Sequence, residues 1–200
     1  EATAETSHVI LVGNQNGYLD GNPEVWKQIL RLAAQGSTVV FLDPDVFKRG
    51  DNPVGGLPLK NKGGLTAFSD WLYHKECIAG IHPLFNNLAG QGIMDWDYYG
   101  PVISNRFFEG QDTPDEVAAT AFAICHSSRP DGFAAGVVLG VYPFGAGNMV
   151  LNTFNILGNV DKHPAADTLL INAIEYALEK SRQKQASPPD DIDAFLKDFE

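Results

Sequence analysis

The sequence predicts an α/β fold in which a mostly parallel, doubly wound sheet is flanked by helices, with an antiparallel β-hairpin near one edge. Three observations lead to this prediction. Residues 8–12 and 38–42 are β-branched apolar runs of the kind found in strands buried on both faces. The helix expected between them completes a parallel βαβ unit. Residues 133–142 and 148–154 flank a glycine turn at Gly145 to Gly147 and predict the hairpin.

The helix of the βαβ unit has clear start and stop signals. Asn22 suits the N-cap, Pro23 the first helical position, and Glu24 places a negative charge in the first turn. Apolar residues then recur at helical spacing until Gly36 ends the helix. By the same reasoning, Pro164 opens a second helix that ends in a basic turn.

The middle of the chain is less regular. Residues 43–64 are rich in Gly, Pro, Asn and Lys and predict a long surface loop. Helical spacing predicts a helix over 65–79, whereas 93–102 and 117–124 are typical of strands.

The predicted organisation has three parts. A loose segment at 1–7 precedes an α/β domain at 8–184, and an acidic linker with a short amphipathic tail covers 185–200. We expect the tail to dock on the domain. The chain opens at Glu1 without a methionine or a signal peptide, so we expect a processed or excised piece, and the compartment stays open.

The charge of the chain argues against two classes of partner. The net charge is −11, and no cluster of Lys and Arg interrupts the acidic balance. Phosphate backbones and anionic membrane surfaces would be repelled. The longest apolar runs are strand-sized, so nothing is expected to span a bilayer. We expect neither a nucleic-acid nor a membrane partner.

The sequence offers no obvious nucleophile. In this fold class a nucleophile usually sits on a glycine-flanked turn between a strand and a helix, and neither Cys77 nor Cys125 has that context. We expect both cysteines to be free and buried, although pairing stays open. His126 and Ser127 follow Cys125, but neighbours on an extended chain point to opposite faces. His126 is retained as a catalytic candidate.

Neither a metal nor a cofactor is expected. The five histidines form no HxH or HExxH pattern. The glycines of the predicted hairpin turn lie between two strands, so they lack the helix N-terminus that would cradle a phosphate.

Asp95 and Asp97 are the other catalytic candidates. On a strand they would share one face about 6.5–7 Å apart, within the range at which paired acids hydrolyse glycosides. The alternative, which we favour, is that these acids only cap a loop or pair with a base. The candidate ligand-binding residues are Trp96, Tyr98 and Tyr99, whose rings would stack on a sugar if exposed, and Arg129, which would be a polar group of a strand-end crevice.

Several stretches together resemble the C-terminal class I glutamine-amidotransferase-like domain of certain bacterial family 2 glycoside hydrolases. The similarity covers roughly residues 8–180 and the acidic tail. The stretches that carry it are KRGDNP at 48–53, LPLKNKG at 57–63, DWLYHKEC at 70–77, HPLF at 82–85, GIMDWDYYGPV at 92–102, FEGQDTP at 108–114, GNMVLNTF at 147–154 and HPAAD at 163–167.

The resemblance implies a flavodoxin-like sheet that has lost the amidotransferase nucleophile. It also implies a parent β-glycosidase whose catalytic glutamates lie in a separate barrel domain, and a periplasmic or secreted location. Similar folds occur in trehalose-utilisation-type proteins and in trimerisation domains of other galactosidases, so these alternatives stay open.

Two hypotheses follow. In the first, the chain is a non-catalytic accessory domain that packs against the catalytic domain of the parent glycosidase or a like subunit, with carbohydrate as a second partner. It predicts an apolar patch near 43–64 or 192–199. In the second, the chain is a free-standing sugar binder or hydrolase that uses a crevice at the strand ends.

Overall fold

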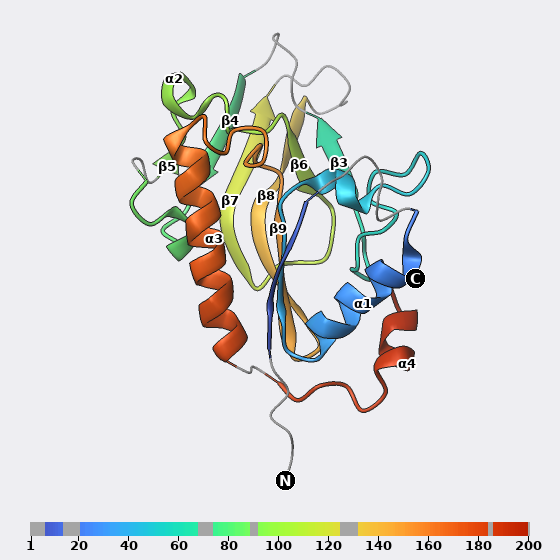
Figure 1. Cartoon of the computed structure of the whole chain (residues 1–200). Helices are drawn as coiled ribbons and strands as arrows, with labels where there is room; N and C mark the ends of the chain where they lie inside the picture. The colour runs from blue at the N-terminus through green and yellow to red at the C-terminus, as the bar shows by residue number, and fades with distance from the viewer. Residues whose placement is uncertain are drawn as a thin grey trace.

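The computed structural model describes residues 7–13, 21–67, 74–88, 92–124, 132–183 and 186–199, and its centre is a mixed sheet (Figure 1). The strands are β1 (Val9–Val12), β2 (Thr38–Phe41), β3 (Gly64–Ala67), β4 (His74–Ala79), β5 (Gly92–Ile93), β6 (Arg106–Glu109), β7 (Glu116–Ile124), β8 (Phe133–Phe144) and β9 (Gly147–Asn152). The helices are α1 (Pro23–Ala34), α2 (Trp96–Tyr99), α3 (Pro164–Arg182) and α4 (Ile192–Lys197), with 3₁₀ turns η1 (Pro44–Phe47) and η2 (Pro83–Phe85).

The prediction of a mostly parallel, doubly wound sheet is wrong. The strand order is β1-β2-β9-β8-β7-β4-β5, and β6 joins β3 to β8. Only the β1–β2 and β2–β9 pairs are parallel among the described strands, and the other six pairs are antiparallel. Parallel neighbours need a long crossover, usually a helix. The described residues between β3 and β9 include only the one-turn helix α2 and the 3₁₀ turn η2, both too short for such a crossover, so these strands pair antiparallel.

The local predictions at both ends of the chain are confirmed. β1, α1 and β2 form the predicted βαβ unit, in which Val9 pairs with Thr38 in parallel register. β7 and α3 also lie where they were predicted. The hairpin at Gly145 forms, with a φ of 62° at that glycine. It lies in the middle of the sheet, however, and not near an edge.

Two element predictions in the middle of the chain are wrong. The described residues of the predicted helix at 65–79 lie in strands instead, because β3 pairs with β6 and β4 pairs with β7. Cross-strand pairing has overridden the helical spacing of the apolar residues. The strand predicted at 93–102 ends at Ile93, and α2 begins at Trp96 because the Asp95 side chain caps it.

The segment at 43–64 is not the surface loop that its composition predicts. Val46, Phe47, Val54, Leu57 and Leu59 are buried in the hydrophobic cluster under α1. The Phe47 ring lies 4.8 Å from that of Phe41 on β2, centroid to centroid. These five apolar side chains therefore belong to the hydrophobic core.

The two long helices pack on opposite faces of the sheet. Val39 and Phe41 of β2 point toward the cluster that includes α1, whereas Val40 and Leu42 point toward the cluster that includes α3. This alternation explains why β2 is buried along its whole length.

The tail docks on the domain, as predicted. Leu196 of α4 is buried, and the rings of Phe195 and Phe199 lie 5.0 and 4.9 Å from the ring of Phe144 in the hairpin. Asp193 also pairs with Arg31 of α1 at 2.5 Å. The apolar side of the tail is thus used within the chain.

A polar cluster joins β7 to α3. Glu116 accepts hydrogen bonds from Tyr176 at 2.8 Å and from Lys180, and His82 Nε2 lies 2.9 Å from the same carboxylate. His82 Nδ1 accepts from the Leu84 amide, so the proton of the neutral ring is on Nε2. Burial alone would raise the pKa of Glu116, but hydrogen bonds from Lys180, His82 and Tyr176 outweigh it and lower the pKa from 4.5 to about 2.

Glu116→Gln is expected to reduce the free energy of unfolding at pH 7 by about 1–3 kcal/mol, because three donors lose a charged acceptor. The pKa is lower in the folded state, so the unfolded chain binds more protons, and the stability due to Glu116 is lost as the pH falls from 4.5 to about 2. Urea unfolding across this pH range should show that the free energy of unfolding falls less steeply with decreasing pH in the variant than in the wild type. Glu175→Gln, at an exposed position of α3, is the control, and identical acid profiles for the Glu116 variant and the wild type would contradict the account.

Candidate functional site

A crevice opens where the parallel strands end. Residues 42–44 follow β2, residues 153–158 follow β9, and residues 103–106 lead into β6; together with Ala67 they enclose a cavity of about 590 Å³. Ligands of open α/β sheets bind at the carboxyl ends of parallel strands. The three-strand parallel part of this sheet therefore places a cavity where that rule expects one.

The crevice has polar and apolar walls. Its apolar lining includes Leu42, Ile103, Phe154 and Ile156, and its polar lining includes Asp43, Ser104, Arg106 and Asn155. The side chains of Asp43 and Arg106 are about one third exposed, at 31% and 34%. Both charges can therefore contact a ligand in the cavity.

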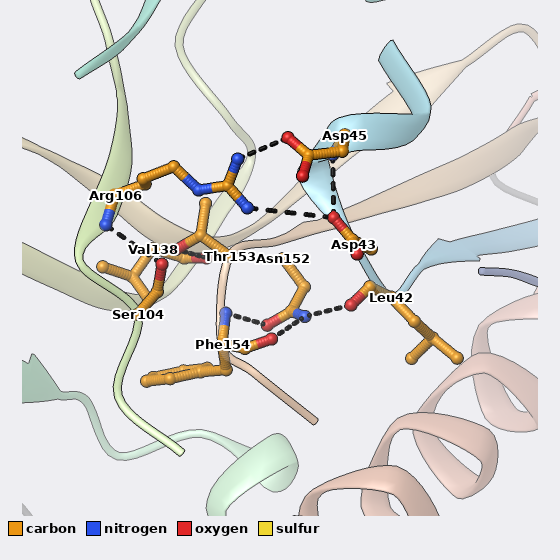
Figure 2. Close-up of polar contacts among 9 residues, drawn as sticks. All are labelled: Leu42, Asp43, Asp45, Ser104, Arg106, Val138, Asn152, Thr153 and Phe154. Carbon is orange, nitrogen blue, oxygen red and sulfur yellow. Dashed lines mark hydrogen bonds and ion pairs between the residues drawn. The ribbon is translucent and has the colours of Figure 1, made fainter. Parts of the chain in front are cut away.

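Arg106 reaches from β6 to the two aspartates that follow β2 (Figure 2). Its guanidinium donates to Asp45, and Nη2 lies 3.9 Å from Asp43 Oδ1. Asp43 Oδ1 also accepts from the Asp45 amide at 2.8 Å and so caps η1. The Arg106 amide donates to Ser104 Oγ at 3.0 Å, which fixes the strand that carries the guanidinium.

Asn152 holds the floor of the crevice together. Its buried side-chain amide donates to the carbonyls of Leu42 and Phe154, both at 3.1 Å, and accepts from the Phe154 amide at 2.9 Å (Figure 2). The Thr153 amide donates to the Val138 carbonyl at 2.9 Å. These bonds fix the ends of β2 and β9 relative to β8, so the cavity is formed before any ligand arrives.

This arrangement is suited to binding a small hydroxylated molecule. Carboxylate oxygens accept hydrogen bonds from hydroxyl groups, guanidinium and amide groups donate to them, and the apolar wall can cover C–H surface. Asp43 Oδ2 makes no hydrogen bond to the described part of the chain, so it is available to such a ligand.

The structure places the two predicted acids elsewhere. Asp95 is the N-cap of α2, where its Oδ1 accepts from the Asp97 amide at 2.9 Å, and Asp97 lies in the first turn. The two residues are therefore not arranged on one face of a strand, and neither of these exposed side chains lines the crevice. Their geometry matches the capping role that we favoured.

Three of the four candidate ligand-binding residues lie in the described part of the chain. Tyr99 is buried and Trp96 packs against the core, whereas Tyr98 is 42% exposed and stacks edge-on against His163 at 5.2 Å. Of these three rings, Tyr98 presents the most surface to a ligand. His126 and Arg129 lie outside the described residues.

Cys77 is free and buried, as predicted, and burial raises the pKa of its thiol to about 12. Since the thiolate is the reactive form, Cys77 is a structural residue. Cys125 lies outside the described residues. Within the described ranges, no group of three His, Cys, Asp or Glu side chains could hold a metal ion.

The sequence analysis missed the crevice residues, although one signal for them exists. In two of the three Asp-x-Asp patterns of the chain, at 43–45 and at 95–97 but not at 191–193, the first Asp caps the turn by accepting from the amide of the second. Only the first pattern follows directly after a buried parallel strand. The position directly after a buried parallel strand is therefore the sequence signal that could have pointed to 43–45 and not to 95–97 as the site.

A second cavity, of about 430 Å³, lies between α1, the turn at 49–56 and the tail. It is lined by Trp26, Leu30, Leu196 and Phe199, and the Arg49 guanidinium lies 5.0 Å from the Trp26 ring centroid. This more apolar cavity is the competing location for a ligand.

Neither a protein-family model nor a curated protein matches the chain in sequence comparison. The resemblance to an amidotransferase-like domain of a glycoside hydrolase therefore stays a prediction. Among the described helices, none has the length and apolar character needed to cross a bilayer.

Asn152→Ala is expected to lower the free energy of unfolding by about 2–4 kcal/mol, because it removes the side-chain partner of the Leu42 carbonyl and of the Phe154 amide, whereas the Phe154 carbonyl keeps its bond from the Ile156 amide. Chemical denaturation measures this loss. Thr153→Val is the matched control in the same floor, since it removes only a 3.4 Å hydroxyl contact to a carbonyl that the Thr153 amide also reaches. Equal losses in the two variants would show that Asn152 does not hold the crevice.

Proposed function

We propose that the chain is a non-catalytic, carbohydrate-binding accessory domain of a glycoside hydrolase, and that the strand-end crevice is its sugar site. The observation that carries this proposal is the crevice itself. It combines an apolar wall with Asp43 and Arg106, each about one third exposed, in a cavity of about 590 Å³. Small-molecule sites are typically cavities of about 300–1,000 Å³ with a few placed polar groups on an apolar lining.

The link to a glycoside hydrolase comes from the sequence resemblance, which spans most of the chain. In that family the catalytic glutamates belong to a separate barrel domain, so the partner of this chain would be the catalytic domain of the parent glycosidase or a like subunit. The described residues near 43–64 and 192–199 bury their main apolar side chains within the chain. A partner surface would therefore lie elsewhere.

The second candidate function is a free-standing sugar binder or hydrolase that uses the same crevice. Asp43 and Asp45 favour it, because two carboxylates near one cavity are the groups that glycoside hydrolysis requires. Arg106 pairs with both of them, so both carboxylates are engaged within the chain. Glycoside hydrolysis needs one acid that is placed to protonate the leaving group, and the pairing with Arg106 therefore suits binding better.

A titration of the chain with neutral mono- and oligosaccharides, followed by heteronuclear NMR, tests the proposal. We expect shift changes at residues 42–45, 103–106 and 153–158, and no hydrolysis of aryl glycosides. Asp43→Asn should weaken binding about tenfold, because an amide replaces the charged acceptor while still capping η1. Asp95→Asn, which changes the matching cap of α2, should leave binding unchanged.

Two results would contradict the proposal. Hydrolysis that disappears in Asp43→Asn would establish the hydrolase alternative. Binding that is lost equally in the Asp43 and Asp95 variants, or shifts confined to the cavity beside Trp26, would remove the crevice as the sugar site.

A further inference from the structure

We infer that the crevice selects uncharged or cationic sugars and excludes sugars that carry a carboxylate, an inference that rests on the proposed function. The reason lies in the surroundings of the cationic group that lines the crevice. Arg106 is a residue type well suited to recognising a uronic acid, but its guanidinium already faces two carboxylates of the same chain.

Each terminal nitrogen of the guanidinium faces a carboxylate of the same chain. Nη1 donates to Asp45 Oδ1, and Nη2 lies 3.9 Å from Asp43 Oδ1 (Figure 2). A ligand carboxylate that formed a bidentate pair with the Arg106 guanidinium would have to displace Asp45. It would also approach Asp43, whose Oδ1 already accepts from the Asp45 amide.

The charges in the crevice add to this selectivity. Asp43, Asp45 and Arg106 together carry one net negative charge, in a chain whose net charge is −11. Like charges brought together at a binding site weaken binding. A hydroxyl or ammonium group, in contrast, can donate to Asp43 Oδ2 without displacing Arg106.

Arg106 and Asp43 are both anchored, so moving them to admit a ligand carboxylate is unfavourable. Arg106 is held by the bond from its amide to Ser104, and Asp43 is fixed as the cap of η1. Asp45, by comparison, is 42% exposed, and its side chain accepts a hydrogen bond from Arg106. Asp45 is thus the residue whose removal would free the guanidinium with the least damage to the fold.

The test compares glucose, glucosamine and glucuronate by isothermal titration at pH 7 and low salt. With the wild-type chain, glucuronate should bind at least about tenfold more weakly than glucose, and glucosamine at least as tightly as glucose. Asp45→Asn should improve glucuronate binding about tenfold and leave glucose binding within about twofold, because it frees one side of the Arg106 fork. Thermal melts establish that the variant is folded.

Asp97→Asn is the matched control, since Asp97 occupies the same position after a capping aspartate in α2 and its loss changes the net charge equally. It should leave all three affinities unchanged. The inference is overturned if wild-type chain binds glucuronate as tightly as glucose, or if the Asp45 and Asp97 variants gain glucuronate binding equally. Failure of all three sugars to bind would instead overturn the proposed function, and the inference with it.

Discussion

The mixed pairing of β9 is the constraint on which the rest of the structure depends. β9 runs parallel to β2 on one side and antiparallel to β8 on the other. The tight hairpin at Gly145 fixes the antiparallel pairing with β8. Gly145 packs closely against α1, because a Cβ atom at this position would lie 2.7 Å from the Ala34 carbonyl oxygen. The hairpin thereby docks the antiparallel part of the sheet against the βαβ unit.

The crevice follows from this junction. Because β2 and β9 are parallel, their carboxyl ends meet at one edge, and Asn152 ties those ends together through buried hydrogen bonds. Because β8 continues past the end of β9, it pairs instead with β6 at Val137, and β6 carries Arg106 to the same edge. The site thus combines charges from the parallel and antiparallel parts of the sheet.

The sequence predicts well those parts of the fold that are determined locally. Capping signals at Pro23 and Pro164 and the glycine turn at Gly145 are enough to locate α1, α3 and the hairpin. The mixed sheet was missed because antiparallel partners of β4 and β7 are chosen by long-range pairing, which local spacing does not reveal. The site was missed for the same reason, since Arg106 lies 61 residues from Asp45 in the chain.

Hydrogen–deuterium exchange of the whole chain tests the proposal that the crevice binds a sugar. Exchange is measured with and without a saturating neutral oligosaccharide. We expect slower exchange in the segments at 42–45, 103–106 and 153–158, which line or adjoin one cavity. Slower exchange confined to α1 and the tail, around Trp26 and Phe199, or no change anywhere, would contradict it.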